Sequence, residues 1–136
     1  MNIRIAEKKD ITTILQYDLH ICKEELANSI FLSRVYICEE KETFIGWMRY
    51  NLFWDHTPFL NLIYILENYR GKGYGKRLIF FWEEQMRQKK YHCVMTSTAS
   101  NETAQYFYKK LDYQHIGGFY YLDDPYEMIF LKKLDF

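Results

Sequence analysis

The chain has 136 residues, carries 18 basic and 18 acidic side chains, and is 49% hydrophobic and 19% aromatic. A chain of this length is normally one domain, and such an aromatic content excludes a disordered protein. The balanced charge argues against a general binder of nucleic acid or acidic membrane, which would carry a basic excess. We therefore expect residues 1–136 to form one globular domain without a nucleic-acid partner.

The sequence shows no targeting segment and no metal-binding motif. No apolar run approaches the roughly 20 residues of a membrane span, and the first ten residues lack the apolar region of a signal peptide. Cys22, Cys38 and Cys93 are widely spaced and form neither a metal motif nor a disulfide framework. These features predict a cytoplasmic protein with no membrane association and no metal.

The first fifty residues are predicted to form a strand, a helical region and a hairpin. Residues 2–6 alternate as a short strand, and Asp10 is a suitable N-cap for the helix that follows. A mostly apolar face at helical spacing runs from Ile11 through Leu19 to Cys22, and the helix is expected to continue, or to restart after a bend, through residues 24–32. Strands at 35–39 and 44–53, joined by the polar turn EEKET, predict a hairpin.

The middle of the chain predicts a strand–helix–strand unit. After the loop WDHTP, residues 59–66 are expected to form a largely buried strand, and residues 74–90 a helix with an apolar stripe. Residues 91–96 are the next predicted strand. Two strands joined by a crossover helix in this way are predicted to be parallel.

The last third of the chain is predicted to hold one helix and two strands. Ser100 or Asn101 is expected to cap the helix, which has a clean apolar stripe over residues 104–111. Strands are expected near 113–122 and 126–134. The final strand is a candidate for pairing across a homodimer, so the expected assembly is a monomer or a homodimer.

The segment NYRGKGYGKRL, residues 68–78, places three glycines and four basic side chains between a predicted strand and a predicted helix. The N-terminus of a helix exposes unpaired N–H groups and carries partial positive charge, and glycine lets a bulky anion approach them. The segment therefore predicts a phosphate or diphosphate site. Neither the Walker A pattern nor the dinucleotide fingerprint fits, because each requires glycine where Lys76 stands.

Two motifs in this order resemble those of the GNAT (Gcn5-related N-acetyltransferase) superfamily, and the overall pattern resembles its small bacterial members. The first, RGKGYG at residues 70–75, matches the family's Arg-x-x-Gly-x-Gly acetyl-CoA loop. The second, NETAQYFYKKLDY at residues 101–113, matches a later helix of the family. Asp112 departs from this motif, because the family most often has Gly there. Gly suits the left-handed residue that ends a helix, and Asp tolerates that conformation.

The resemblance covers essentially the whole chain and implies an α+β fold. We expect a central mixed, mostly antiparallel sheet of six or seven strands, splayed between its two central parallel strands, with about four helices packed on both faces. The resemblance further implies an N-acetyltransferase that moves an acetyl group from acetyl-CoA, its co-substrate, to a primary amine by direct transfer in a ternary complex.

The expected binding residues for acetyl-CoA are carried over by position in the two motifs. The main chain of Ile63 and Ile65 is expected to hold the pantetheine. The amides of residues 71–76, helped by the side chain of Arg70, are expected to hold the diphosphate. The complete expected set is Ile63, Ile65, Arg70, Gly71, Lys72, Gly73, Tyr74, Gly75, Lys76, Asn101 and Tyr108.

For catalysis, the resemblance assigns Tyr108 as the general acid that protonates the departing thiolate. The general base stays open among Glu67, Asp55, His56 and a water chain. Ribosomal-protein N-terminal acetyltransferases, which are similar in layout, use a glutamate on the strand after the crossover helix. Thr96 stands at that position here and cannot act as that base.

The acceptor amine is expected to belong to a small molecule or a peptide, and nothing in the sequence chooses between them. Glu24 and Glu25 are candidates for attracting a cationic amine. Two alternative functions remain, a non-catalytic acyl-CoA sensor and a protein N-terminal acetyltransferase. Aromatic side chains are expected to line the acceptor cavity: Trp47, Tyr50, Trp54, Phe119, Tyr120 and Tyr121.

Overall fold

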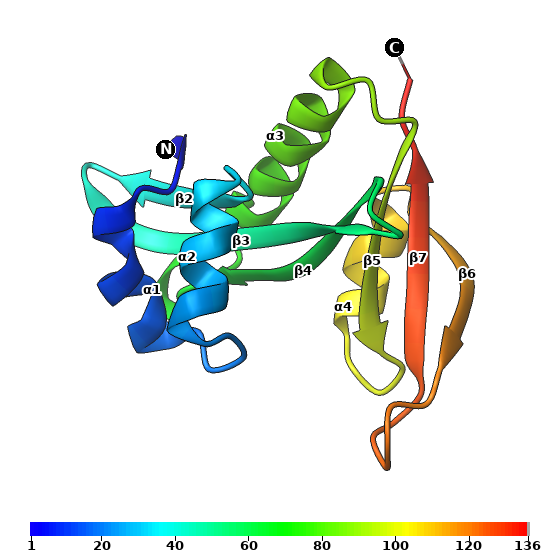
Figure 1. The fold of residues 1–136 in the computed structure, drawn as a ribbon. Helices are drawn as coiled ribbons and strands as arrows, with labels where there is room; N and C mark the ends of the chain where they lie inside the picture. The colour runs from blue at the N-terminus through cyan, green and yellow to red at the C-terminus, as the bar shows by residue number, and fades with distance from the viewer. Residues whose placement is uncertain (136) are drawn as a thin grey trace. The chain divides into compact units, whose positions relative to one another are not determined.

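The computed structural model describes residues 1–135, whose seven strands form one hydrogen-bonded sheet in the order β1-β2-β3-β4-β5-β7-β6 (Figure 1). Most neighbouring strands are antiparallel, and β4 and β5 are parallel. The chain divides into two compact units. The first holds Met1–Asn51 and Leu62–Phe81, and the second holds Leu52–Asn61 and the chain from Trp82 onward. The expected mixed, mostly antiparallel sheet is confirmed.

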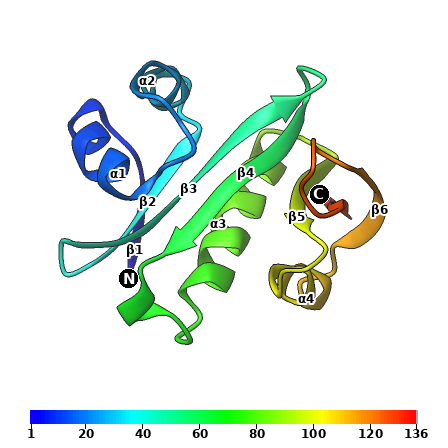
Figure 2. The same cartoon turned by 90° about the horizontal axis from the view of Figure 1, so that it is seen from below.

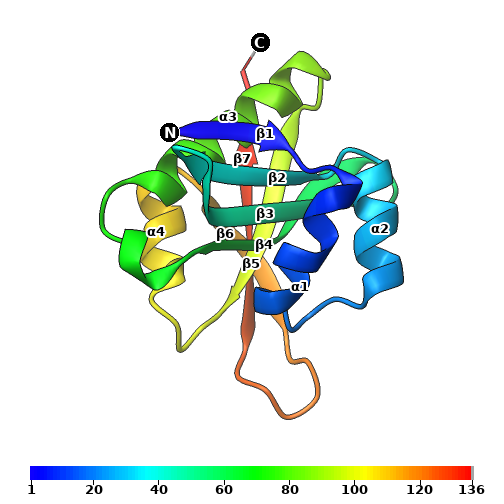
Figure 3. The ribbon, with the colours of Figure 1, turned by 90° about the vertical axis from the view of Figure 1, so that its left-hand side faces the viewer.

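In the first unit, β1 (Asn2–Ile5), β2 (Val35–Glu40) and β3 (Thr43–Phe53) pair in antiparallel order. The helices α1 (Ile11–Tyr17) and α2 (Lys23–Phe31) lie against one face of these strands (Figures 2 and 3). Their apolar side chains close a core there because they alternate with polar ones at the helical period. Fully buried members of this core include Ile14, Leu26, Val35 and Ile37.

The helix α3 (Tyr74–Gln88) begins in the first unit, on the opposite face of the strands from α1 and α2 (Figure 2). The Phe81 ring there meets the Tyr36 ring of β2 edge to face, with centroids 5.4 Å apart. Helices thus cover both faces of the strands, as the sequence predicted. The helix ends close to the boundary expected for it, residue 90.

The predicted helix after Asp10 breaks at Asp18 and restarts at Lys23, which decides between the two alternatives left open by the sequence. The predicted apolar face does not continue beyond this break, because Leu19 is 85% exposed. That part of the prediction was wrong. Asp18 adopts an extended backbone and turns a fully buried carboxylate towards β3. That carboxylate accepts hydrogen bonds from Arg49 Nε at 2.8 Å and Trp47 Nε1 at 3.2 Å.

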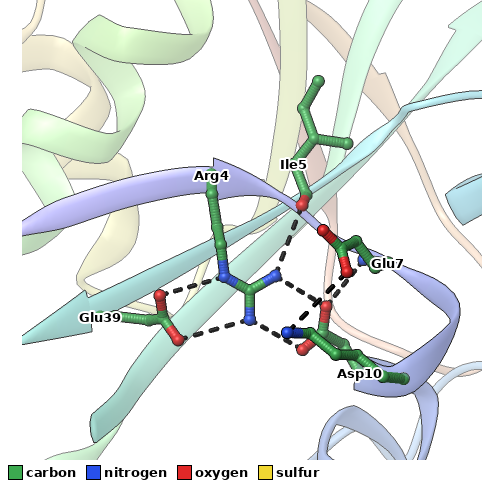
Figure 4. A network of polar contacts seen from close by, with 6 residues as sticks. Arg4, Ile5, Glu7, Asp10 and Glu39 are labelled. Carbon is green, nitrogen blue, oxygen red and sulfur yellow. Dashed lines mark hydrogen bonds and ion pairs between the residues drawn. The ribbon is translucent and has the colours of Figure 1, made fainter. Parts of the chain in front are cut away.

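Asp10 occupies the expected N-cap position of α1, but its carboxylate does not cap that helix. It instead accepts two hydrogen bonds of 2.8 Å from the Arg4 guanidinium and one of 2.7 Å from the Glu7 amide (Figure 4). Arg4 also binds Glu39 on β2. The Arg4 guanidinium is the largest cause that lowers the pKa of Asp10. This ion-pair cluster joins β1, β2 and the start of α1.

In the second unit, β7 (Glu127–Lys133) lies between β5 (Cys93–Ala99) and β6 (Gln114–Phe119), as Figure 1 shows. Both of its edges are therefore paired, and the expectation that this final strand pairs across a dimer was wrong. The strand beyond β7, at this edge of the sheet, is β6. The strand β4 (Thr57–Ile65) enters this unit through its first residues.

The parallel pairing of β4 and β5 joins Phe59 to Met95 and Leu60 to Thr96. This pairing confirms the predicted strand–helix–strand unit. The last helix, α4 (Ala104–Lys110), has Thr103 at its N-cap position. Neither Ser100 nor Asn101 caps it, because the chain makes one more turn before the helix begins.

Candidate active site

The glycine segment lies between the end of β4 and the start of α3, where the sequence predicted it. A short 3-10 turn, η2 (Glu67–Tyr69), carries the chain away from β4. Gly71 and Gly73 then adopt φ angles of +75° and +84°. Residues other than glycine rarely adopt these backbone angles. A Cβ placed on either glycine would meet no atom within 4 Å, so the backbone here is open to a bound molecule.

The first turn of α3 provides hydrogen-bond donors next to these glycines. At the start of α3, the amide of Arg77 donates a 3.1 Å hydrogen bond to the carbonyl of Gly73. The amides of Tyr74, Gly75 and Lys76 precede it, and a helix supplies no acceptor for amides at these positions. They carry the partial positive charge of the helix N-terminus. A diphosphate fits this combination of open backbone and adjacent donors.

Two lysines add positive charge to the loop. The Lys72 ammonium lies 5.8 Å from the centroid of the Tyr69 ring, and the Lys76 ammonium lies 5.7 Å from that of Phe80. Both side chains are exposed. Each is therefore able to move towards an anion bound at the amides.

The Arg70 side chain binds the strand that precedes the loop. Its Nε donates a 2.7 Å hydrogen bond to the carbonyl of Ile65, and its guanidinium lies 4.8 Å from the centroid of the Tyr64 ring. These contacts anchor the loop to the end of β4. The expected contact between Arg70 and the diphosphate stays a prediction.

The Tyr74 side chain also anchors the loop, because it contacts the end of a neighbouring strand. Its phenol donates a 2.5 Å hydrogen bond to the carboxylate of Glu40 at the end of β2. That hydrogen bond is the largest cause that raises the pKa of Tyr74. The predicted contact between Tyr74 and the diphosphate therefore concerns the main-chain amide of this residue and not its phenol.

The end of β4 lies tightly against β3 in the first unit. The amide of Leu66 donates a 2.8 Å hydrogen bond to the carbonyl of Ile45. A Cβ placed on Gly46 would come within 2.5 Å of the Tyr64 carbonyl oxygen, so only glycine fits there. This packing fixes the segment that carries Ile63 and Ile65.

Tyr108 belongs to the second unit, where it is 5% exposed on α4. Its ring meets those of Phe107, Tyr113 and Phe130, with centroids 5.4, 5.6 and 6.1 Å away. Burial raises the pKa of the phenol, and hydrogen bonding to Thr96 offsets part of this rise. The phenol therefore stays protonated at neutral pH, which suits an acid and excludes a base.

The helix that carries Tyr108 ends as the second motif predicted. Asp112 adopts a φ of +72°, the left-handed conformation for which the family most often uses glycine. The amide of Tyr113 then returns to the carbonyl of Tyr108, at 3.1 Å. The departure from the motif leaves the helix end intact.

The predicted site residues divide between the two units. Residues from Ile63 to Lys76 belong to the first unit, whereas Asn101 and Tyr108 belong to the second. Asn101 is exposed in the turn before α4. Within the first unit, the structure brings the two glycines, the first amides of α3 and both lysines together.

The three candidate bases, Glu67, Asp55 and His56, are exposed. The imidazole Nδ1 of His56 lies 2.8 Å from Thr57 Oγ1, so this ring has a local hydrogen-bond partner. Thr96 is buried, and its hydroxyl donates a 3.1 Å hydrogen bond to the Leu60 carbonyl. None of these observations selects a base.

Two of the aromatic side chains expected to line the acceptor cavity are buried, so this expectation was wrong for them. Trp47 is 1% exposed and Tyr50 is 4% exposed, so neither ring is open to an acceptor. Both lie in the middle of β3, which is buried over residues 45–50. The exposed candidates are Trp54, Phe119, Tyr120 and Tyr121. Glu24 and Glu25 are exposed in the first turn of α2.

No role was predicted for Glu40 or for the hydroxyl of Thr96. Glu40 ends the hairpin strand beside a polar turn, a setting that normally holds a solvated charge, so no local signal marks it as the partner of Tyr74. Thr96 has a weak signal, since it is a polar residue at a buried position of the strand CVMTSTA.

Comparison with known proteins identifies the family. The sequence profile of the Acetyltransferase (GNAT) family matches residues 6–113, well over half of the chain. The chain therefore belongs to the GNAT family of acetyltransferases, an enzyme family whose co-substrate is acetyl-CoA. The family and the enzyme class predicted from the sequence are confirmed. None of the curated proteins matches the chain significantly.

Solved structures share the fold over nearly the whole chain. A GNAT acetyltransferase from Bacillus cereus is 24% identical, with a TM-score of 0.80, and covers 98% of this chain and 96% of its own. A ribosomal-protein-alanine N-acetyltransferase from Brucella melitensis is 20% identical, with a TM-score of 0.81 and coverage of 98% and 100%. The PaiA N-acetyltransferase from Thermoplasma acidophilum, in complex with coenzyme A, is 19% identical, with a TM-score of 0.81 and coverage of 97% and 98%.

Two further findings concern residues 1–135. No helix in this range is long and apolar enough to cross a membrane. No group of three or more His, Cys, Asp or Glu side chains in the same range is placed to hold a metal ion.

Proposed function

We propose that this protein transfers the acetyl group of acetyl-CoA to a primary amine of a small molecule or peptide, by direct transfer in a ternary complex. The observation that carries the proposal is the loop at residues 71–76. Two glycines there have positive φ and open space around them, directly before helix amides that lack an intrahelical acceptor.

The chain's own residues hold the co-substrate in the following way. The amides from Gly71 to Lys76 bind the diphosphate, and Lys72 adds its charge. The main chain of Ile63 and Ile65 binds the pantetheine as a neighbouring strand would. The Ile65 carbonyl already accepts Arg70, but a carbonyl oxygen has a second lone pair. Asn101 contacts the same molecule.

The reaction needs a neutral amine as nucleophile and an acid for the leaving thiolate. Acetyl-CoA supplies a thioester whose carbonyl the amine attacks. Tyr108 donates its phenolic proton to the departing thiolate, because burial keeps that proton in place at neutral pH. The amine loses its proton to Glu67, Asp55, His56 or a water chain.

We further propose that residues 1–136 work as one GNAT domain in the cytoplasm. The family match over residues 6–113 supports this, because it includes residues of both compact units. The assembly is a monomer or a homodimer, without nucleic acid or membrane as partner.

The test is an acetyl-CoA consumption assay over polyamines, aminoglycosides, amino acids and peptides with free N-termini, followed by Tyr108→Phe. We expect one amine class to be acetylated. Tyr108→Phe should lower kcat by about 10²-fold while CoA still binds, as the loss of a general acid predicts. The matched control is Tyr106→Phe, since Tyr106 is on the same helix and 57% exposed.

Each alternative function has its own outcome in this assay. Tight CoA binding without turnover on any amine would contradict the proposal and favour an acyl-CoA sensor. Peptides that outcompete every small amine would identify a protein N-terminal acetyltransferase. A Tyr108→Phe variant as fast as the Tyr106→Phe control would remove Tyr108 from the mechanism.

A further inference from the structure

The glycine loop has more conformational freedom than the strand and the helix beside it. A Cβ placed on Gly71 or Gly73 would meet no atom within 4 Å, so close packing does not hold these two residues in place. Glycine also loses more conformational entropy on ordering than any other residue. A ligand binds more weakly to a loop that it must first order. Contacts that hold the ends of this loop therefore raise its affinity for a diphosphate.

Glu40 lies where it can hold the helical end of the loop. It is the last residue of β2 and pairs with Thr43 in the hairpin of β2 and β3. Its Oε2 accepts a 2.5 Å hydrogen bond from the phenol of Tyr74, the first residue of α3. Its Oε1 lies 3.6 Å from the main-chain nitrogen of Met1. The carboxylate thus joins a hydrogen-bonded strand to the residue that directly follows the second glycine.

The ring of Tyr74 extends this contact to the other end of the loop. Its centroid lies 6.5 Å from that of Tyr69, which belongs to the 3-10 turn before the glycines. The Tyr69 ring in turn lies 5.8 Å from the ammonium of Lys72. Aromatic pairs at such distances attract each other. The residues on both sides of the two glycines therefore pack together, and Glu40 holds them; all of them belong to the first unit.

We propose that Glu40 is a positioning residue for the co-substrate. Through the phenol of Tyr74, it holds the loop in the conformation that presents the amides of residues 71–76 to the diphosphate. This inference rests on the proposed function, because it takes these amides as the CoA site. Since Glu40 acts through Tyr74 and not on the reacting atoms, its loss weakens the binding of acetyl-CoA and leaves the chemical step unchanged.

The negative charge of Glu40 makes the direction of the effect informative. A carboxylate beside a bound diphosphate repels it, so charge alone predicts that Glu40→Gln binds CoA more tightly. The positioning role predicts weaker binding, because a neutral amide is a poorer acceptor than a carboxylate for the Tyr74 phenol. Tyr74→Phe removes the same hydrogen bond but keeps the carboxylate, and it should also weaken binding.

The experiment measures the binding of CoA and dephospho-CoA by isothermal titration. Glu40→Gln and Tyr74→Phe should each lose about 3- to 10-fold in affinity, as expected for a partly exposed hydrogen bond to a charged group. Both ligands should lose affinity equally, because both contain the diphosphate. The double variant should bind about as well as Tyr74→Phe alone, since both changes break one contact. Glu42→Gln is the matched control, because Glu42 is exposed in the turn after β2, and it should bind like the wild type.

Steady-state kinetics show which step the contact serves. In the most active amine assay, the KM for acetyl-CoA should rise in Glu40→Gln by about the factor found in the titration. At saturating acetyl-CoA, kcat should stay within about twofold of the wild type, because the loop conformation affects binding only. Glu42→Gln should change neither constant.

Amide hydrogen exchange in the free protein reports on the loop itself. Amides on either side of the glycines donate hydrogen bonds within the segment: those of Tyr69, Arg70 and Arg77. They should exchange faster in Glu40→Gln and in Tyr74→Phe than in the wild type, because the loop opens more often without its anchor. Exchange in Glu42→Gln should match the wild type.

The proposal is wrong if Glu40→Gln binds CoA as tightly as the wild type or more tightly, if exchange in the loop does not change, or if the losses in the double variant are fully additive. Failure of the proposed function gives a different pattern. In that case Gly73→Glu also binds CoA like the wild type, so the loop is not the CoA site, and the positioning role falls with it. If Gly73→Glu loses affinity and Glu40→Gln does not, only the role of Glu40 is refuted.

Discussion

Replacing Gly73 by glutamate should remove most of the affinity for CoA. At a φ of +84°, any side chain with a Cβ costs roughly 1–2 kcal/mol, so the loop leaves the conformation that binds. The new carboxylate would also lie near the diphosphate. At about 5 Å and an effective dielectric constant between 20 and 80, each pair of unit charges repels by about 1–3 kcal/mol. Together these costs correspond to about a 30-fold loss or more.

Isothermal titration with CoA separates the two costs when Gly73→Gln is measured beside Gly73→Glu. The glutamine has the same backbone strain and similar bulk without the charge, so its loss should be about 5- to 30-fold. The further loss in the glutamate variant should shrink as salt rises from 50 to 500 mM, because salt screens exposed charges.

The matched control is Gly117→Glu in the second unit. Gly117 also has open space around its Cβ position but lies outside the loop. This variant should bind CoA like the wild type. Equal affinities of the wild type, Gly73→Gln and Gly73→Glu would refute the assignment of the loop. A Gly73→Glu loss that does not respond to salt would refute the electrostatic part of the reasoning.

Two further predictions concern the scaffold around the loop. Asp18→Asn should lower the free energy of unfolding by about 3 kcal/mol at pH 7, because it leaves Arg49 buried without its charged partner. Burial raises the pKa of Asp18, but hydrogen bonds from Arg49, the His20 amide and Trp47 outweigh it, so the folded pKa is lowered. The stabilisation is therefore present above the unfolded pKa of about 3.9 and is lost as pH falls through the folded value. Urea unfolding at pH 7 and pH 3 should show the difference between the two proteins narrowing in acid, and a constant difference would contradict this. Gly46→Ala should cost about 1–3 kcal/mol and weaken CoA binding, because its Cβ would press on the Tyr64 carbonyl; unfolding and CoA titration equal to wild type would contradict it.

Features encoded by local chemistry could be predicted from the sequence. The strand, glycine turn and helix around residues 60–88 follow from hydrophobic periodicity and from the conformational freedom of glycine, and the structure has them at those positions. The left-handed Asp112 is a local feature of the same kind, since a helix end requires that conformation whatever lies around it.

Features set by distant contacts could not be predicted. The break at Asp18 depends on Arg49 and Trp47, about thirty positions further along the chain, whereas the local pattern still favours a helix. The burial of Trp47 and Tyr50 depends on which elements cover β3, and the residue types alone do not show this.

Two contacts in the candidate site could not be predicted for a similar reason. The hydrogen bond from Arg70 Nε to the Ile65 carbonyl could not be predicted, because the charge of the side chain does not show which acceptor lies beside it. The Thr96 hydroxyl acquires its hydrogen bond to the Leu60 carbonyl only when β4 and β5 come together.

The central claim is that main-chain amides at residues 71–76 bind the diphosphate of CoA. A crystal structure of the protein with bound CoA tests it most directly. Our account predicts several of these amide nitrogens at about 3 Å from diphosphate oxygens, the ordinary length of such a hydrogen bond. A diphosphate bound elsewhere on the protein, with these amides facing only water, would contradict it.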